Sequence, residues 1–364
     1  MSESINWQRN TGTDVAAIAY LALVIVLSLS LNLFQLIHSI IFAQESESSL
    51  HLCDFDRIKK FDRRGNLIAS WGERGEENGE FIHPHGIAVD HAGNVYVTDE
   101  VRQDIQKFDS NGHFLMKWGS DGAGKGQFSN QLEDVNTDSS ESIYIVDYGN
   151  SRILKFDSNG SFIAMWGTKG SEQGQFDRPW GIAFDSSSNA YVTDLRNNRI
   201  QKFDSNGTFI MQWGSEGSGP GQFIHLHGIA IDIDDNVYVS DARDNSRVSK
   251  FDAEGNLQSS WGSLGSEEGQ FKEHHGIDFD SQGNVYVADT GNRRIQIFSP
   301  DGVFLREWNS SRSGTQNDLV MPQDIAIDSF DNVYISDVGD AHPEISYVEA
   351  YLSEHQNLTS AECD

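Results

Sequence analysis

The sequence predicts an all-β protein, a six-bladed β-propeller preceded by one N-terminal transmembrane helix. Three observations support this prediction: two ladders of aromatic residues keep a constant spacing, each repeat holds four short strand patterns, and one long uncharged segment lies near the N-terminus. The predicted domains are a polar N-terminus at 1–14, a transmembrane helix at 15–43, a linker at 44–54, the propeller at 55–340 and a C-terminal tail at 341–364.

The composition agrees with a large β-architecture and excludes one class of partner. The 364 residues include 34 glycines and only 6 prolines, which is typical of many short strands joined by tight turns. A hydrophobic content of 37% is enough for a packed core. The formal net charge of −29 repels phosphate backbones, so we expect no nucleic-acid partner, and it favours a neutral or cationic ligand.

The segment from Val15 to Ala43 contains no Asp, Glu, Lys or Arg. A bilayer core needs about 20 apolar residues, so VAAIAYLALVIVLSLSLNLF is long enough to span a membrane. The hydrophobic region of a cleavable signal sequence usually has about 7–15 residues, which favours an uncleaved anchor with the propeller outside the cytoplasm. Cleavage before Gln44 would instead give a secreted protein.

The rest of the chain repeats with a period of 47 or 48 residues, and this is the strongest signal in the sequence. Six tryptophans and six phenylalanines keep the period in step. The tryptophans are Trp71, Trp118, Trp166, Trp213, Trp261 and Trp308, and the phenylalanines are Phe61, Phe108, Phe156, Phe203, Phe251 and Phe298. We expect both ladders to form the core between neighbouring repeats.

One repeat unit runs from Phe81 to Gln127 and contains four strand patterns. The expected strands lie at 87–90, 94–99, 105–109 and 114–119, and the last two form a hairpin across the Asn-Gly turn of DSNG. A four-stranded unit of about 45 residues that repeats radially is a propeller blade.

The two ends of the repeat region are incomplete and complement each other. Residues 320–337 supply only the first two strands of a blade, and residues 57–71 supply only the last two. We therefore expect a composite closing blade from 55–79 and 320–340 beside five complete blades. Such closure leaves no open sheet edge.

An acidic and a basic residue flank the loop after the second strand of most repeats. The strand-ending acids are Asp99, Asp147, Asp194, Asp241, Asp289 and Asp337. The bases are Arg152, Arg199, Arg247 and Arg294, with Arg57 at the matching point of the closing blade and Asp104 in place of arginine in the first repeat. We interpret these pairs as ion pairs that tie a loop, and a charged ring that reads a ligand is the alternative.

The strings PxGIAxD, NVYVTD, RIQKFDSNG and WGSxGxGxGQF resemble NHL repeats over residues 55 to about 340. This resemblance implies a fold rather than an activity, because NHL propellers serve as scaffolds, binding modules and, less often, enzymes. We expect a non-catalytic binding or scaffold module for a protein, peptide or saccharide ligand. The alternative is a metal-dependent lyase or hydrolase with its site at the mouth of the central channel.

One position varies among otherwise similar repeats, directly before the inner strand. Packing that all blades share dictates the residue type at repeating positions. At a varying position this demand is absent, so ligand binding can determine the residue type. In propellers this position faces the channel mouth, so we expect the side chains there to line any ligand site. They are His85, Glu133, Trp180, His227, His275 and Gln323.

The local contexts of His85, His227 and His275 resemble those of the zinc-binding histidines of peptidyl-amidoglycolate lyase, a six-bladed NHL-like enzyme. The ligands of that lyase come from alternating blades. Here His85 and His227 lie three blades apart and His275 lies next to His227, which serves one zinc ion poorly at about 2.0–2.1 Å from each nitrogen. We therefore assign no metal ligand, and zinc and calcium are the only cofactors that we consider.

The cysteines and sequons bear on the cellular compartment. Cys53 precedes the first half of the closing blade and Cys363 follows its second half, so we expect them to pair as a disulfide in an oxidising compartment, and two unpaired thiols are the alternative. No C-x-x-C spacing supports a zinc finger. The sequons at Asn159, Asn206, Asn309 and Asn357 are compatible with glycosylation outside the cytoplasm.

We predict that the mature protein retains residues 15–43 and sediments with membranes, because the segment exceeds the usual length of a cleavable signal. N-terminal sequencing of protein from the native host tests this prediction. A mature chain that begins at or near Gln44 would contradict the anchor and indicate secretion.

Overall fold

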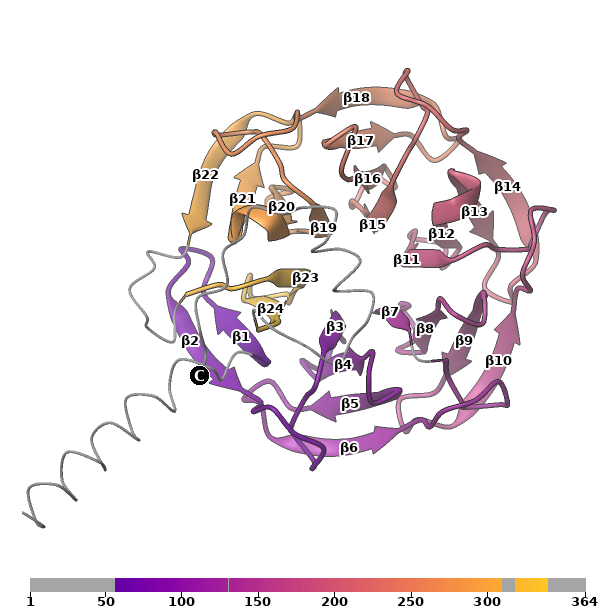
Figure 1. Ribbon diagram of the computed structural model, residues 1–364, viewed down its shortest axis with the longest axis vertical. Helices are drawn as coiled ribbons and strands as arrows, with labels where there is room; N and C mark the ends of the chain where they lie inside the picture. The colour runs from indigo at the N-terminus through magenta and orange to yellow at the C-terminus, as the bar shows by residue number, and fades with distance from the viewer. Residues whose placement is uncertain (1–55, 130, 310–317, 340–364) are drawn as a thin grey trace, which may run out of the picture. The chain divides into compact units, whose positions relative to one another are not determined.

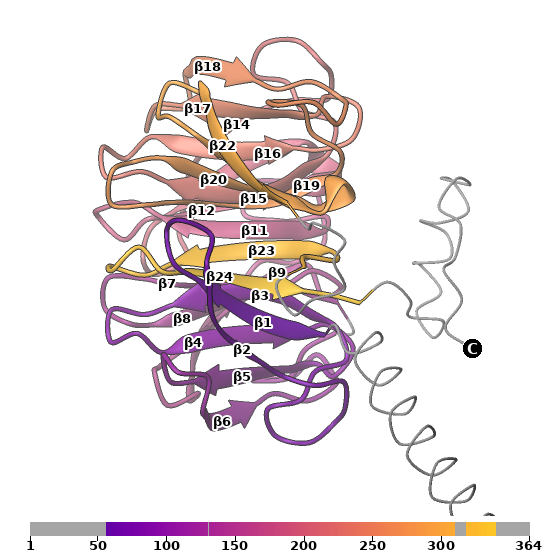
Figure 2. The same ribbon diagram turned by 90° about the vertical axis from the view of Figure 1, so that its left-hand side faces the viewer.

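The structure is a computed structural model that describes residues 56–129, 131–309 and 318–339. These ranges contain 24 β-strands and two short 3₁₀ helices, and no α-helix. The strands form six four-stranded antiparallel sheets. Figure 1 shows the sheets arranged radially around a common axis, and Figure 2 shows the same ring from its side. The predicted all-β six-bladed propeller is therefore confirmed.

The blades are numbered here in chain order, and in each the first strand lies innermost. Blades 1 to 3 comprise β3 (Pro84–Val89), β4 (Val95–Asp99), β5 (Asp104–Phe108), β6 (Phe114–Trp118); β7 (Leu132–Thr137), β8 (Ile143–Asp147), β9 (Arg152–Phe156), β10 (Phe162–Trp166); and β11 (Pro179–Phe184), β12 (Ala190–Asp194), β13 (Arg199–Phe203), β14 (Phe209–Trp213). Blades 4 and 5 comprise β15 (Leu226–Ile231), β16 (Val237–Asp241), β17 (Arg247–Phe251), β18 (Leu257–Trp261); and β19 (His274–Phe279), β20 (Val285–Asp289), β21 (Arg294–Phe298), β22 (Phe304–Asn309). The 3₁₀ helices are η1 (Leu195–Asn197) and η2 (Thr290–Asn292).

Blade 6 closes the ring with strands from both ends of the described chain. It contains β23 (Pro322–Ile327) and β24 (Val333–Asp337), followed by β1 (Arg57–Phe61) and β2 (Leu67–Trp71). β1 pairs antiparallel with β24, with Phe61 opposite Val333. In Figure 1 the indigo and yellow strands accordingly share one blade. The closing blade is composite, as its sequence pattern indicates.

The aromatic ladders connect each blade to the next. Trp118 of blade 1 packs against Tyr96 of its own blade at 6.3 Å between ring centroids and against Phe156 of blade 2 at 6.0 Å. The same contact closes the ring, because Trp308 of blade 5 lies 5.8 Å from Phe61 of blade 6. Aromatic pairs of this kind contribute about 0.5–1.5 kcal/mol beyond their buried area. The predicted inter-blade core is therefore present at the seam.

The glycine of the outer hairpin makes room for this tryptophan. Gly112 of blade 1 has a φ of 85°, which an L side chain rarely adopts, and a Cβ there would lie 2.5 Å from the Trp71 ring of blade 6. The Asn-Gly turn in DSNG thus serves two purposes. It reverses the chain between the third and fourth strands, and it presents a flat backbone surface to the preceding blade.

The repeated Asp and Arg residues form the loop-tying ion pairs that the spacing predicts. In blade 2, Arg152 Nε lies 2.9 Å from Asp147 Oδ2, and the guanidinium also donates to the carbonyls of Ala123 and Gln127 in the connection between blades. Blades 3 and 5 repeat the pair at 2.8 and 2.7 Å, and blade 4 has it at 3.5 Å. Each pair therefore fixes the connection that leads into the inner strand of its own blade.

Two blades place the cation differently from the sequence expectation. In blade 6 the buried Lys59, rather than Arg57, donates to Asp337 Oδ2 at 2.6 Å. In blade 1, Arg102 lies in the loop before β5 and pairs with Asp104 at 3.0 Å. The side chain of Arg102 also donates to the carbonyl of Glu77, so it replaces the missing strand arginine.

Several predicted features lie outside the described residues. These are the segment 15–43, both cysteines and Asn357, and the side chain of Asn309 is likewise not described. Among the residues that the structure does describe, no helix has the length and apolar character needed to cross a membrane. Asn159 and Asn206 are exposed in hairpin turns, where a glycan would meet no steric obstacle from the core.

We predict that Arg199→Met lowers the free energy of unfolding by about 3 kcal/mol, because it leaves the buried Asp194 carboxylate without its ion-pair partner. Arg196→Met, three residues earlier and exposed, is the matched control and should change it by less than about 0.5 kcal/mol. Chemical denaturation of the two variants measures both values. Equal stability of the two variants would contradict a structural role for the pair.

Candidate functional site

The six inner strands enclose a central channel that widens at one end. The channel cavity has a volume of about 430 Å³ and is lined by residues of β3, β7, β11, β15, β19 and β23. The mouth cavity, about 640 Å³, shares residues with it and includes the loops after the second strands of several blades. This volume suits an organic ligand of moderate size.

Close approach of the inner strands keeps the channel narrow. A Cβ at Gly228 of β15 would lie 2.4 Å from the carbonyl oxygen of His275 in β19, and one at Gly86 of β3 would lie 2.7 Å from Asp134 Cα in β7. A side chain at either glycine would therefore push neighbouring blades apart. Blades 2 and 6 instead carry Asp134 and Asp324 at this position.

All six side chains that the sequence singles out line the mouth cavity. Each is the second residue of its inner strand, where the pairing with the second strand shifts register. An irregularity of this kind re-aims a side chain out of the regular pleat. The residues brought together are His85, Glu133, Trp180, His227, His275 and Gln323.

Four of these residues form a continuous cluster of rings. Trp180 stacks on His227 at 4.2 Å between centroids, and His227 meets His275 edge to face at 4.5 Å. His85 lies 5.6 Å from Trp180 and 6.2 Å from His275. Tyr148, which the sequence reasoning missed, packs edge-on against Trp180 at 5.8 Å.

Hydrogen bonds fix the orientation of two imidazoles. His85 Nδ1 donates to the carbonyl of Glu133 at 2.7 Å, and His275 Nδ1 donates to Gln323 Oε1 at 2.8 Å. In a neutral imidazole the other nitrogen, Nε2, is then an acceptor. The varying position therefore links blade 1 to blade 2 and blade 5 to blade 6.

The imidazoles of the cluster are uncharged at neutral pH. Burial lowers the pKa of His275 to about 3, and it lowers the pKa of His227 well below its ordinary value, with the neighbouring His275 adding to the effect. His83, in the loop before β3, is the exception. Burial lowers its pKa, but the hydrogen bond and charge of Glu100 outweigh burial and raise it overall.

Within 56–129, 131–309 and 318–339, no group of three or more His, Cys, Asp or Glu side chains is arranged to hold an ion. His85 and His275 both use Nδ1 for hydrogen bonds within the protein, which leaves Nε2 of each to face a ligand. The three histidines whose local contexts resemble a zinc site pack as part of the ring cluster.

Three arginines at the mouth were not anticipated from the sequence. Arg178, Arg196 and Arg243 line the cavity together with Glu100, Glu133 and Glu216. The net charge of −29 predicts acidic surroundings and a neutral or cationic ligand, but local charge at the mouth is balanced. A comparison of the repeats could have revealed Arg196 and Arg243. Both are the second residue after the strand-ending Asp, a position that holds glycine in three other blades.

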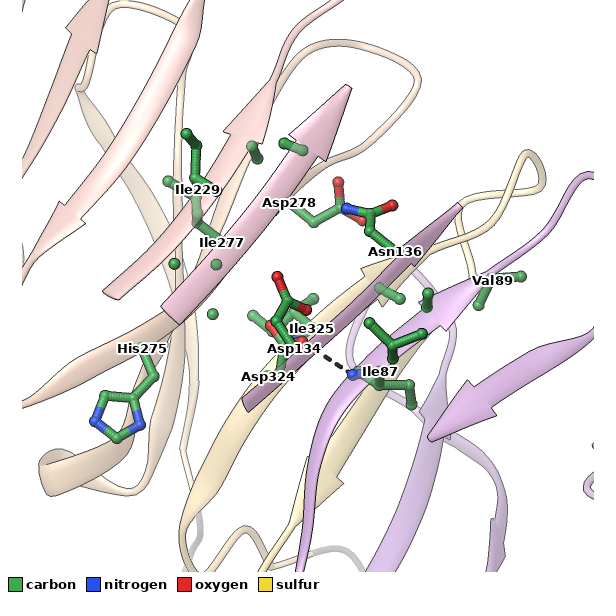
Figure 3. A pocket seen from close by; sticks show the side chains of 18 of the residues that line it. Ile87, Val89, Asp134, Asn136, Ile229, His275, Ile277, Asp278, Asp324 and Ile325 are labelled. Atoms are coloured by element: carbon green, nitrogen blue, oxygen red, sulfur yellow. Dashed lines mark hydrogen bonds between the residues drawn. The ribbon is translucent and has the colours of Figure 1, made fainter. Parts of the chain in front are cut away.

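Deeper in the channel, three carboxylates connect the inner strands. Figure 3 shows Asp134, Asp278 and Asp324 facing the channel. Each accepts a backbone N–H of a neighbouring inner strand, from Ile182 at 2.8 Å, Ile327 at 2.7 Å and Ile87 at 3.0 Å. Burial raises the pKa of Asp278 and of Asp324 to about 7. The pKa of Asp134 also rises well above the usual range, chiefly because of burial and secondly because of the nearby charge of Asp324.

Two family models match the chain. The family described as a 6-bladed beta-propeller matches residues 91–166 and 182–260, and the NHL repeat matches residues 275–298. A search of curated proteins found no match.

Solved structures share the fold at low sequence identity. A streptogramin B lyase is 14% identical at a TM-score of 0.54, over 78% of this chain and 95% of that one. A catalytically inactive virginiamycin B lyase from Staphylococcus aureus, solved with quinupristin, is 15% identical at 0.51, over 70% and 78%. A protein of unknown function from Bacteroides thetaiotaomicron is 14% identical at 0.57, over 77% and 73%. Likeness at this level concerns the fold alone.

Six radial four-stranded sheets around a channel, with a ligand-sized cavity at one end, define a six-bladed β-propeller. Its blades carry one sequence pattern at a period of 47 or 48 residues, and the NHL match falls on one of them. The chain is an NHL-repeat six-bladed β-propeller.

The channel carboxylates generate a prediction about pH. Because the pKa of Asp278 rises from 3.8 to about 7 on folding, the folded state binds more protons than the unfolded state between these values. The contribution of Asp278 to the free energy of unfolding therefore falls as pH rises from about 4 to about 7. Asp278→Asn should therefore gain stability relative to wild type across this range. Asn136 already occupies the equivalent position in blade 2, where its side chain donates to the Ile182 carbonyl at 2.9 Å.

Denaturation curves for wild type and variant between pH 4 and pH 8 measure this effect. Asp204→Asn is a control of opposite sign, since hydrogen bonds from Thr208 lower the pKa of this exposed carboxyl. A difference between Asp278→Asn and wild type that stays constant over the pH range would contradict the prediction.

Proposed function

We propose that this propeller is a binding module whose ligand occupies the mouth cavity. The observation that carries the proposal is the ring cluster of Trp180, His227 and His275 on the wall of a cavity of about 640 Å³. Concave sites lined by aromatic side chains with a few polar groups are the usual form of ligand sites.

The distribution of variation between blades supports this proposal. The tryptophans, the tyrosines of the second strands and the strand-ending aspartates recur in all six blades, since each blade needs them to pack. The mouth position carries an imidazole, a carboxylate, an indole or an amide instead. Such an uneven ring can distinguish the two ends of an asymmetric ligand.

The protonation states of the ring-cluster imidazoles and of His225 favour binding over acid–base catalysis by these residues. A general base works best when its pKa lies near the operating pH. The pKa of His275 lies at about 3 and that of His225 at about 4, in both cases chiefly through burial. These imidazoles can donate and accept hydrogen bonds, but they are poor proton carriers at neutral pH. A metal-dependent lyase or hydrolase remains the second candidate for the same cavity.

We also propose that the module is displayed at a membrane surface, outside the cytoplasm. The support is the uncharged segment 15–43 together with the sequons at Asn159 and Asn206, which lie in exposed turns. A ligand would then reach the mouth cavity from the extracytoplasmic medium, and a protein, peptide or saccharide are the classes we consider.

The proposal is tested by screening a fragment library against full-length protein with ligand-detected NMR. We expect fragments that bind wild type and lose at least about tenfold in affinity in the double variant His227→Ala, His275→Ala, because the stacking surface is removed. His113→Ala, at an exposed histidine of a hairpin turn, is the control and should leave binding unchanged.

Unchanged binding of all hits in the folded double variant would move the site elsewhere and contradict the proposal. Metal analysis of the same preparations separates the second candidate. Stoichiometric zinc in wild type that is lost in the double variant would favour the metal-dependent enzyme.

A further inference from the structure

The arginines that line the mouth cavity come from two neighbouring blades. Blade 3 supplies Arg178 and Arg196, and blade 4 supplies Arg243. The acidic residues Glu100 and Glu133 come from blades 1 and 2. Trp180 and His227 belong to the same two blades as the arginines. In a chain with 26 basic and 55 acidic residues, three arginines among the lining residues of one cavity are a local enrichment of positive charge.

The repeats themselves show that packing does not require two of these arginines. Arg196 and Arg243 are each the second residue after the strand-ending Asp of their blade. The equivalent residues are Val101, Gly149, Gly291 and Gly339. The arginines are not part of an inserted strand, because both blades keep four strands. Blades 3 and 4 therefore carry arginine at a position where the other four blades fold with glycine or valine.

The backbone at Arg243 and Arg178 is one that glycine adopts more easily. Their φ angles are 55° and 61°, in the left-handed region that costs energy for long L side chains. Retaining arginine there is a departure from what local conformation favours. Such departures concentrate at binding sites, where the side chain rather than the backbone is selected.

The three guanidinium groups differ in their contacts within the protein. Arg178 donates to the Tyr148 hydroxyl at 3.1 Å, and Arg243 Nε lies 3.5 Å from Glu273 Oε1. Within the described residues, the Arg196 side chain makes no hydrogen bond or salt bridge. The pKa of His225, lowered to about 4 by burial and then by Arg243 and Arg196, shows that both charges act on the same imidazole.

We propose that the mouth binds a planar aromatic monocarboxylate, with its ring on the Trp180 cluster and its carboxylate held by Arg196 and Arg243. This inference rests on the proposed binding function and specifies its ligand class. A guanidinium matches a carboxylate with parallel N–H donors, and such charge-assisted bonds are stronger than neutral ones. The ring cluster supplies stacking surface next to these donors.

The charge balance selects one kind of anion. Glu216 lies among the lining residues on the arginine side, and Glu100 of blade 1 and Glu133 of blade 2 line the same cavity. These carboxylates oppose a doubly charged group such as a phosphate monoester more strongly than a singly charged one. A monocarboxylate therefore fits the arginines without an excess of negative charge.

The test uses three probes with the same ring: 2-naphthoate, 2-naphthamide and 2-naphthyl phosphate. Full-length protein is titrated with each by ligand-detected NMR, with blanks that contain the same solubilising agent. We expect 2-naphthoate to bind about tenfold more tightly than the amide, since hydrogen bonds to charged groups are the stronger ones, and more tightly than the phosphate.

The double variant Arg196→Met, Arg243→Met should abolish the preference for the acid over the amide. Arg63→Met, Arg64→Met removes the same charge from an exposed turn of blade 6 and should preserve the preference. Equal affinity for acid and amide, no binding of the acid to wild type, or tighter binding of the phosphate would each overturn the inference.

The failure of this inference is distinguishable from failure of the proposed function. Hits that depend on His227 and His275 but not on Arg196 and Arg243 would uphold a binding module and reject the carboxylate. A naphthoate preference that survives in the arginine variant but disappears in the histidine variant has the same meaning.

Discussion

The contact between the tryptophan of one blade and the phenylalanine of the next is the interaction on which the rest of the structure depends. It occurs at every seam, and a ring gains its stability only if the last seam closes as well as the first. Trp308 and Phe61 supply that last contact, although 247 residues of sequence order separate them, as their numbers show. Closure holds the six inner strands at a fixed distance from the axis. The channel, its mouth and the side chains that face them are consequences of this geometry.

The fold could be predicted because packing demands are the same in every blade. Two aromatic ladders in register and an Asn-Gly turn specify the blade, and the incomplete repeats at 57–71 and 320–337 specify its closure. The location of the mouth residues followed from the same repetition. The repeat pattern could not predict which neighbouring group a non-repeating side chain contacts. Arg57 and Lys59 lie on the same face of β1, and it is the buried Lys59 that reaches the Asp337 carboxylate.

Departures from the repeat fall into two groups with different physical meaning. Some are compensated locally: Arg102 moves into a loop and Asp104 receives it, so the connection between blades stays tied. Others have no structural partner that requires them, such as Arg196 in a blade whose buried ion pair is already complete through Arg199. Net charge did not reveal the three arginines at the mouth because it averages over a surface, whereas a ligand meets only a few side chains. Residues of the second group carry the functional argument.

The composite blade has one more consequence, for the energetics of opening. Gln323 belongs to the closing blade, and its bond to His275 joins that blade to the wall of the mouth cavity. A molecule that bridges the cavity would contact segments from both ends of the propeller chain and would act as a clasp across the seam. Separation of blade 6 from blade 5 or blade 1 would then have to release the occupant first, so occupancy and resistance to this separation would rise together by mass action. The ring would be tightest when its centre is filled.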